Sequence, residues 1–227
     1  MTNRSRSDRA WRGVRVARVA GALVGLALAF GVRGARADGA APTPEAGKKW
    51  DASLRAGLHF GGKMQPSDGV SAIYVGSAPI GALEVNAMVF ERYSLGGYLM
   101  YASLPIDDIG NGSGGKAPCH SCSGSMWSLG VVGKVRFGTL DRFEVRPAVY
   151  VGRNALSFSF AGTERSGSGI NVGAGIEAAR AFGQLVGLVQ LGFFSQVSGT
   201  FAFGDGKDRD FAFPPKAFLV AGIEKQF

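Results

Sequence analysis

The sequence predicts an all-β protein, an eight-stranded antiparallel up-and-down barrel that follows a segment directing export. Three observations predict this fold class. Apolar residues alternate with polar or small residues in eight stretches of the chain. The connections between these stretches alternate between short and long. Aromatic residues recur near the ends of the stretches with a shared parity, so they point to one face of the expected sheet.

The chain begins with a segment that has the layout of an export signal. Residues 1–18 carry six arginines and one acid, and the 14 residues from Val19 to Val32 are uncharged. This apolar core is shorter than the roughly 20 residues that a membrane-spanning helix needs, which argues against an uncleaved anchor. The small residues Ala35 and Ala37 then fit a signal-peptidase site, so we expect cleavage between Ala37 and Asp38.

Cleavage there divides the chain into a signal peptide (residues 1–37), a flexible leader (38–49) and one barrel domain (50–227). The signal holds eight of the 25 Lys and Arg residues and one of the 17 Asp and Glu residues, which leaves 17 basic and 16 acidic residues. The basic character of the whole sequence therefore belongs to the signal. A nucleic-acid partner would need a clustered basic face, so we exclude that class.

Alternation is clearest in the first stretch of the barrel domain. Every even position from Trp50 to Phe60 is apolar, and polar or small residues such as Asp51 and Arg55 lie between. Side chains alternate across a strand, so one face is apolar. The pattern recurs at residues 81–89, 93–101, 127–137, 143–151, 170–178, 185–193 and 217–227. Each stretch has about the 9 to 11 residues that a tilted transmembrane strand needs.

The links between these stretches differ in length in a regular way. Short links lie at Glu91-Arg92, at residues 138–142 and at Gly183-Gln184, and long links cover residues 62–79, 104–125, 154–168 and 197–216. A soluble β-sandwich has no reason to alternate its links in this way. Bacterial outer-membrane barrels do, with short turns in the periplasm and long loops outside. The fold class is therefore a transmembrane barrel with short periplasmic turns and long extracellular loops.

Aromatic residues mark both ends of the expected strands, as in the girdles found at the two membrane interfaces. The periplasmic set is Trp50, Tyr93, Phe137, Phe143, Phe182 and Phe227, and the outer set is Phe60, Tyr101, Trp127 and Phe193. With this pattern over residues 50–227, the chain resembles the family of small outer-membrane β-barrel proteins of Gram-negative bacteria.

The resemblance is most specific in the last strand, which ends the sequence on an aromatic residue. It implies that Leu219, Ala221, Ile223 and Phe227 form the signal that the outer-membrane insertion machinery recognises. Lys225 departs from the family pattern, which usually has an aromatic or aliphatic residue there, although a lysine can snorkel to the headgroups. The expected partners are thus outer-membrane lipid, lipopolysaccharide and the insertion machinery, and a monomer is expected.

Inward positions of the expected barrel collect charges of both signs. The basic set is Arg55, Lys134, Arg136 and Arg146, and the acidic set is Glu84, Glu144, Glu177 and Glu224. If Phe137 lies opposite Phe143, Arg136 faces Glu144. Lys134 then faces Arg146, so Glu177 or Glu224 must approach that pair. An eight-stranded interior is just wide enough for side chains, which predicts an occluded lumen, and the network is open to a purely structural interpretation.

The two cysteines, Cys119 and Cys122, lie in the second long link. An exported protein meets an oxidising compartment, so a disulfide is the first expectation. A redox-active pair and a metal site with His120 are the alternatives, and the metal site lacks an identifiable fourth ligand. The neighbouring His120 and Ser121 have no orienting acid nearby in sequence. We therefore predict no enzyme, no cofactor and no metal.

Aromatic residues in the outer links leave two function classes open. One is a structural or surface-interaction barrel, in which these rings bind an extracellular ligand or lie against lipopolysaccharide and one another. The other is a narrow conduit or binding protein for a small hydrophobic compound, which enters near Phe158, Phe160 and Phe194 and leaves sideways through the wall. The candidate binding residues are Phe158, Phe160, Phe194, Phe201, Phe203, Phe211 and Phe213. The last four flank a charged tip, residues 205–210, which predicts a hairpin in the fourth long link.

Overall fold

The computed structural model describes residues 50–66, 72–110, 115–140, 143–160, 162–202 and 208–227. The expected signal peptide, its cleavage site between Ala37 and Asp38, and the leader lie outside the described residues. Within the described ranges, no helix combines the length and apolar character needed to cross a membrane.

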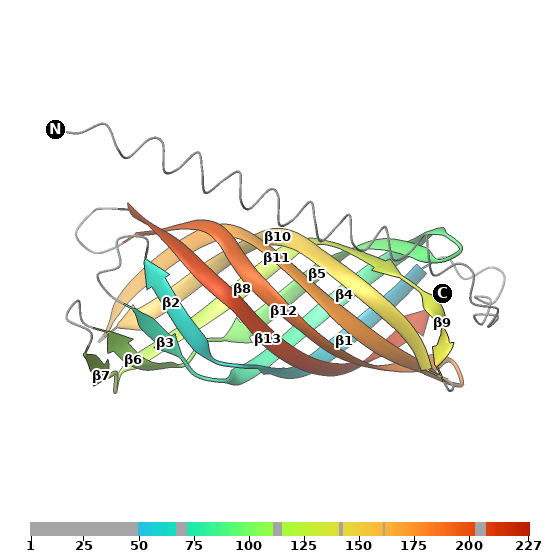
Figure 1. Cartoon of the computed structure of the whole chain (residues 1–227), viewed down its shortest axis with the longest axis horizontal. Coiled ribbons are helices and arrows are strands. Elements are labelled where there is room, and N and C mark those ends of the chain that lie inside the picture. The colour runs from blue at the N-terminus through green and yellow to red at the C-terminus, as the bar shows by residue number, and fades with distance from the viewer. Residues whose placement is uncertain (1–49, 67–71, 111–114, 141–142, 161, 203–207) are drawn as a thin grey trace. The chain divides into compact units, whose positions relative to one another are not determined.

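Eight long strands form a closed antiparallel barrel, and each strand pairs with its neighbour in sequence order (Figure 1). They are β1 (Trp50–His59), β4 (Ala78–Phe90), β5 (Tyr93–Ser103), β8 (Cys122–Val135), β10 (Phe143–Phe160), β11 (Thr163–Phe182), β12 (Leu185–Ala202) and β13 (Asp208–Gln226). The barrel closes between β1 and β13, in a register that runs from Asp51 opposite Gln226 to His59 opposite Phe218. Full closure leaves no unpaired edge along this part of the wall.

Four short strands form an additional sheet at the end of the barrel opposite the C-terminus (Figure 1). They are β2 (Gly62–Pro66), β3 (Ile73–Val75), β6 (Ile106–Gly110) and β7 (Lys116–Pro118). We call this the cap sheet. It joins the barrel wall where β2 pairs with β13, at Phe211 opposite Pro66. The two long links that carry these strands thus contain regular structure, which their Gly- and polar-rich sequences did not predict.

The third long link, residues 154–168, is also paired strand. β10 and β11 remain in register to Phe160 opposite Thr163, and the hairpin turns at Gly162, whose φ is 82°. Such a positive φ suits a residue without Cβ. The fourth link behaves similarly, since β12 and β13 still pair at Ala202 opposite Asp208. The strands therefore extend well beyond the length that a bilayer requires.

Burial alternates along the strands in the reverse sense to that of a soluble protein. Leu54, Leu129 and Ile176 are 62%, 66% and 61% exposed, whereas the inward-pointing Arg55 and Glu177 are 2% and 0% exposed. An exterior covered by large apolar side chains, with charge inside, is stable only when lipid surrounds it. The exposure pattern therefore defines a transmembrane barrel.

The turn before β10 differs from its expected geometry. A short strand, β9 (Phe137–Leu140), pairs with β10 so that Phe137 lies opposite Val145 and Phe143 lies opposite Leu140, with a bulge at Glu144 and Val145. The prediction that Phe137 faces Phe143 is therefore wrong.

The expected Lys134 and Arg146 pair is wrong as well, because Lys134 lies opposite Ala148. The bulge and the pairing of β9 shift the register of this hairpin.

Candidate functional site in the barrel lumen

The lumen next to the short turns is filled by charged side chains that strand alternation directs inward. At its centre lies Glu177, whose side chain is 0% exposed. Its carboxylate oxygens lie 2.7 Å from Arg55 Nη1, 3.4 Å from Lys134 Nζ and 3.1 Å from Arg146 Nη1. Glu84 adds a second bridge, 2.8 Å from Arg55 Nη2 and 2.5 Å from Lys134 Nζ. Two carboxylates and three cations thus connect β1, β4, β8, β10 and β11 across the lumen.

Arg146 extends the network toward the short turns. Besides Glu177, it contacts Glu224 and Glu144, each at 2.7 Å. Arg136 lies 3.7 Å from Glu144, so the contact expected from the sequence forms even though the register differs. The structure brings all eight predicted lumen residues into one ion-pair network. Burial of so much charge is tolerable only because each group has an opposite partner.

One acidic residue of the network was missing from the sequence-based set. Asp51 is 3% exposed and lies 3.1 Å from Arg136, and it accepts a hydrogen bond of 2.7 Å from Asn86. Its inward parity was visible in the alternation of β1, but its partner is 85 residues away and only the closed barrel shows it. With Asp51, the described network holds five acids and four bases.

A layer of neutral polar side chains lies beyond the charges. Tyr150 donates a hydrogen bond of 3.0 Å to Glu84 and accepts one of 2.7 Å from Gln190. Gln190 in turn accepts a hydrogen bond of 2.6 Å from Arg55. Tyr98 stacks edge-on against Tyr150 with ring centroids 5.3 Å apart and donates to Asn171. This layer joins the charged half of the lumen to the half beneath the cap sheet, and the sequence analysis did not single it out.

The outer half of the lumen is mainly apolar and continuous with the cap sheet, although the polar side chains of His59, Asn154, Gln196 and Lys216 are buried at this end as well. One cluster of buried side chains joins barrel residues such as Leu156 and Phe158 to the cap residues Met64, Val75 and Ile106. A cavity of about 30 Å³ lies at the boundary of this cluster and the polar layer. Its lining is Arg55, Ile80, Ala82, Glu84, Tyr98, Met100, Tyr150, Asn171, Gly173, Gln190, Phe193, Phe194, Phe218 and Val220.

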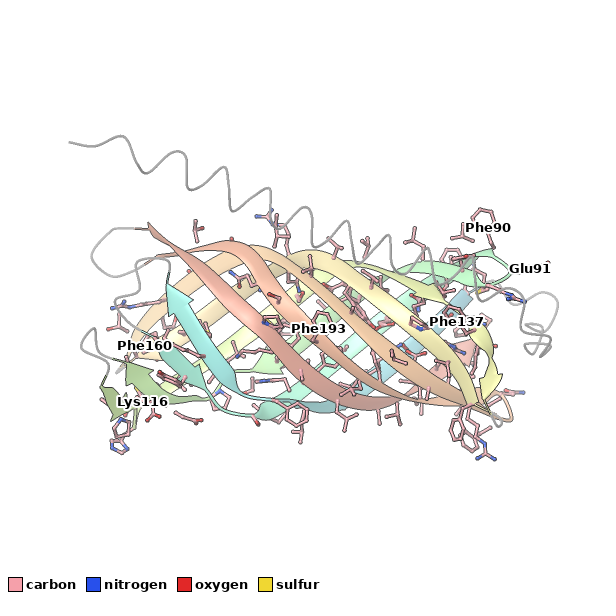
Figure 2. All side chains as sticks on the ribbon, viewed as in Figure 1. Phe90, Glu91, Lys116, Phe137, Phe160 and Phe193 are labelled. Carbon is pink, nitrogen blue, oxygen red and sulfur yellow. A yellow bond between two sulfur atoms is a disulfide. The ribbon has the colours of Figure 1, made fainter. Side chains whose placement is uncertain are left out.

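The candidate binding aromatics do not form one surface. Phe158 is 1% exposed and Phe194 is 6% exposed, and both belong to the core beneath the cap sheet. The expectation that Phe158 is exposed in the third long link is wrong, because inward parity continues along β10 beyond the predicted strand end. Entry of a compound near Phe158, Phe160 and Phe194 stays a prediction. Phe160 packs at the margin of this core, with its ring centroid 6.0 Å from that of Phe158 (Figure 2).

Three of the other four aromatics belong to the last hairpin. Phe201 is opposite Arg209, Phe211 is opposite Pro66 and Phe213 is opposite Gln196 in the strand register. Phe203 lies outside the described residues. The hairpin predicted for this link is confirmed by the pairing of β12 with β13.

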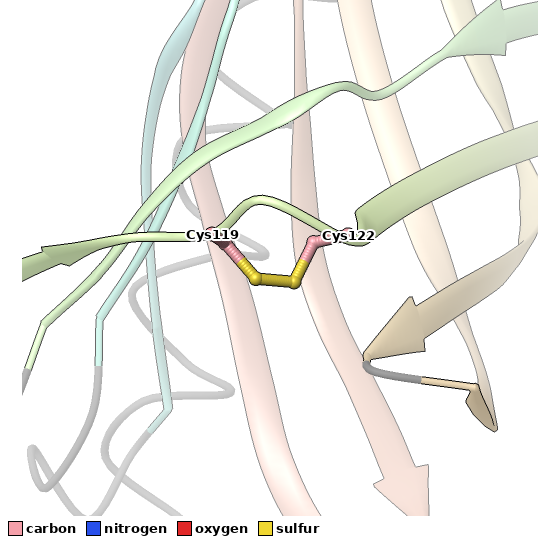
Figure 3. The surroundings of a disulfide bond; sticks show 2 residues. All are labelled: Cys119 and Cys122. Atoms are coloured by element: carbon pink, nitrogen blue, oxygen red, sulfur yellow. A yellow bond between two sulfur atoms is a disulfide. The ribbon is translucent and has the colours of Figure 1, made fainter.

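Cys119 and Cys122 are joined by a disulfide at the turn between β7 and β8 (Figure 3). This pairing confirms the first expectation for the two cysteines, and it leaves neither thiolate available to a metal. The neighbouring His120 and Ser121 are exposed on the turn. Cys119 also donates a backbone hydrogen bond of 3.1 Å to the carbonyl of Asp107, which ties the turn to β6.

The residues of the expected insertion signal lie together on the outer face of the closing strand. Leu219, Ile223 and Phe227 are 45%, 55% and 58% exposed, and Ala221 is exposed between them. Their strand, β13, completes the barrel by pairing with β1.

The closed eight-stranded wall, the apolar exterior and the filled lumen are the fold of the small outer-membrane β-barrel proteins. Three solved structures share it, each aligned over nearly its whole length. Neisserial surface protein A matches with a TM-score of 0.53 and 12% identity, covering 78% of this chain and 96% of that one.

The outer membrane protein OprG from Pseudomonas aeruginosa matches with a TM-score of 0.52 and 12% identity, covering 79% of this chain and 97% of that one. A major outer membrane protein from Thermus thermophilus matches with a TM-score of 0.51 and 16% identity, covering 78% of this chain and 99% of that one. No family model matches the sequence. No curated protein matches it either. Identities this low establish the fold alone.

Proposed function

We propose that the chain is an integral outer-membrane barrel with an occluded lumen and a structural or surface-interaction role. The observation that carries this proposal is the burial of the charge network. The side chains of Arg55, Lys134, Arg146, Glu84 and Glu177 are each 0 to 2% exposed, which supports a lumen that is closed to water at this level. A pore would need charged side chains that line a solvated space instead.

Burial at the other end of the lumen supports the same proposal. An apolar cluster is buried beneath the cap sheet, with Met64 and Leu104 at 0% and 1% exposure. The remaining cavity of about 30 Å³ is far below the roughly 300 Å³ of an ordinary ligand pocket. What remains accessible to other molecules is the outer surface of the cap sheet and the long hairpins.

Conductance tests the occlusion directly. The refolded protein, inserted in planar bilayers, is expected to give no large, resolved current steps. A porin inserted in the same bilayers serves as the positive control, and heat-modifiable migration on gels shows that the refolded protein is a folded barrel. Large steps from the unaltered protein would overturn the proposal.

Location and processing belong to the same proposal. Export through a cleaved signal peptide to a Gram-negative outer membrane follows from the layout of residues 1–37 and from the apolar exterior of the barrel. Outer-membrane lipid, lipopolysaccharide and the insertion machinery are the proposed partners of a monomeric barrel. A mature N-terminus at Asp38 in the outer-membrane fraction is the expected result, and an intact N-terminus would contradict it.

A second candidate is a binding protein or conduit for a small hydrophobic compound, and the cavity favours it. The cavity reaches the wall, because its lining includes both the inward Phe194 and the lipid-facing Phe193 (Figure 2). The wall is weakened at that level, since the pairing of β12 and β13 shifts between Phe194 and Gln196, opposite Pro214 and Pro215. Proline has no N–H to donate to a ladder.

The dye N-phenyl-1-naphthylamine distinguishes the two candidates. The second candidate requires saturable binding of the dye by the refolded protein, and Ala82→Phe, which fills the cavity, must abolish that binding without loss of folding. A matched change on the lipid face, Ala56→Phe, serves as the control. The occluded barrel predicts no saturable binding to either variant or to the unaltered protein.

A further inference from the structure

Two cations are fixed on aromatic rings on the outer face of the barrel, beside the short turn between β11 and β12. The guanidinium of Arg180 lies over the ring of Phe143 at 5.6 Å and over the ring of Phe182 at 5.4 Å. On β13, Lys225 Nζ lies 5.2 Å from the ring centroid of Phe227. We call these five residues the rim patch. The rings hold the two charges at the membrane interface by cation–π contact.

Strand register places the two cations on neighbouring rows of the wall. Phe182 pairs with Leu185, which pairs with Lys225, so these three form one row. Arg180 pairs with Gly187 in the adjacent row. Arg180 and Lys225 are thus separated by one intervening strand, about 10 Å across the wall at a strand spacing of about 4.8 Å. At this separation, one anionic headgroup can lie between both charges.

Gly187 shapes the surface between the cations. A Cβ at this position would lie 3.0 Å from the ring of Phe182, so the ring lies across the glycine. On the intervening strand, Gly187 therefore adds no side chain beside Arg180, whereas the exposed Leu185 lies between Phe182 and Lys225.

The nearby carboxylates do not neutralise this surface. Glu144 and Glu224 belong to the same strands as Phe143 and Lys225, but they point into the lumen and pair with Arg146. Among the described residues, no carboxylate lies within ion-pair distance of Arg180 or Lys225. Two positive charges at a lipid interface, with no carboxylate at ion-pair distance among the described residues, attract an anionic headgroup, at about 1 kcal/mol per charge.

We infer that the rim patch binds the phosphate of an anionic phospholipid in the leaflet at the short-turn end. Arg180 supplies a fork of N–H donors that matches phosphate oxygens, and Lys225 supplies a second charge. The acyl chains of the lipid then lie along the apolar exterior, over exposed side chains such as Ile176 and Ile223. The site is separate from the lumen and does not depend on whether the lumen is occluded.

Native mass spectrometry of the refolded protein in detergent tests this inference. With dioleoyl phosphatidylglycerol and dioleoyl phosphatidylcholine in equal amounts, we expect the anionic lipid to be retained preferentially. Arg180→Gln should weaken its apparent affinity about fivefold, which corresponds to the loss of one interfacial charge. Lys225→Gln should weaken it by a similar or smaller factor.

Two further variants separate a built site from general charge attraction. Arg92→Gln removes a charge from the exposed turn between β4 and β5 and should leave lipid retention unchanged. The double change Phe143→Leu and Phe182→Leu keeps the charge of Arg180 but removes its rings, and should still reduce the preference. Equal retention of the two lipids would overturn the inference, as would equal effects of Arg180→Gln and Arg92→Gln.

Discussion

The two halves of the lumen are filled by different kinds of side chain. The half beside the short turns is filled by paired charges that come from β1, β4, β8, β10, β11 and β13. The half beneath the cap sheet is filled mainly by apolar side chains from the wall and the cap, with a few buried polar residues such as His59 and Lys216 among them. Each charged group depends on specific partners across the barrel, whereas an apolar group depends only on filled volume. The charged half is therefore the more sensitive to single substitutions.

The largest expected effect follows from neutralising Glu177. Glu177→Gln leaves Arg55, Lys134 and Arg146 buried with one fewer negative partner, and removal of one member of a buried ion network costs about 3 to 5 kcal/mol. Urea unfolding of the refolded protein in micelles measures the loss. Glu91→Gln, in the exposed turn between β4 and β5, is the matched control and should change the unfolding free energy very little. A loss below about 1 kcal/mol for Glu177→Gln would show that the carboxylates that still contact these cations, Glu84, Glu144 and Glu224, compensate for its removal.

The apolar half should respond to a change in volume. Leu156 is 2% exposed beneath the cap, and Leu129, on the neighbouring β8, is 66% exposed to lipid. Leu156→Ala leaves a cavity and should lower the unfolding free energy by about 3 kcal/mol. Leu129→Ala creates no enclosed cavity, because lipid or detergent tails fill the space, and should cost clearly less. Equal losses in the two variants would mean that the outer half of the lumen is not close-packed.

The edge of the charged half should be weaker than its centre. Arg136 and Asp51 lie 3.1 Å apart, but the Arg136 side chain is 11% exposed, compared with 0% for Glu177. A double-mutant cycle with Arg136→Gln and Asp51→Asn should give a coupling free energy of about 1 to 2 kcal/mol. A coupling as large as the whole loss from Glu177→Gln would remove the distinction between edge and centre.

These contrasts also explain what could be predicted from the sequence. The alternation of apolar and polar residues identified the strands and all eight inward charges, because the side chains of a strand point to opposite faces at successive positions. The pairing of charges across the lumen could not be predicted in the same way. Asp51 and Arg136 are 85 residues apart in the sequence, and only the closed barrel brings them into contact. The bulge at Glu144 and Val145 shifted one hairpin away from its expected register.

The cap sheet was the larger omission. Its strands are only three to five residues long and are stabilised by pairing with one another and by burial against the lumen. Short strands of this kind have too little periodicity to identify from one sequence. Phe158 was assigned to a loop for a different reason: alternation continues through Leu156, Phe158 and Phe160, but the apolar residues there lie on the inward face instead of the outward face.

The smallest effect is expected at the disulfide, which tests whether the cap sheet unfolds separately from the barrel. Cys119 and Cys122 are separated by only three positions, so the bond constrains the unfolded chain by no more than about 2 kcal/mol. If the cap opens locally, replacing both cysteines by serine should leave barrel unfolding within about 1 kcal/mol of the unaltered protein. The amide at position 119, which donates to the Asp107 carbonyl, should then exchange roughly tenfold faster. The opposite outcome is that the unfolding free energy of the barrel falls by the full amount, about 2 kcal/mol, and that this amide exchanges no faster than the amides of the barrel strands. Cap and barrel would then unfold as one cooperative unit, and the half of the lumen beneath the cap would tolerate local change no better than the charged half.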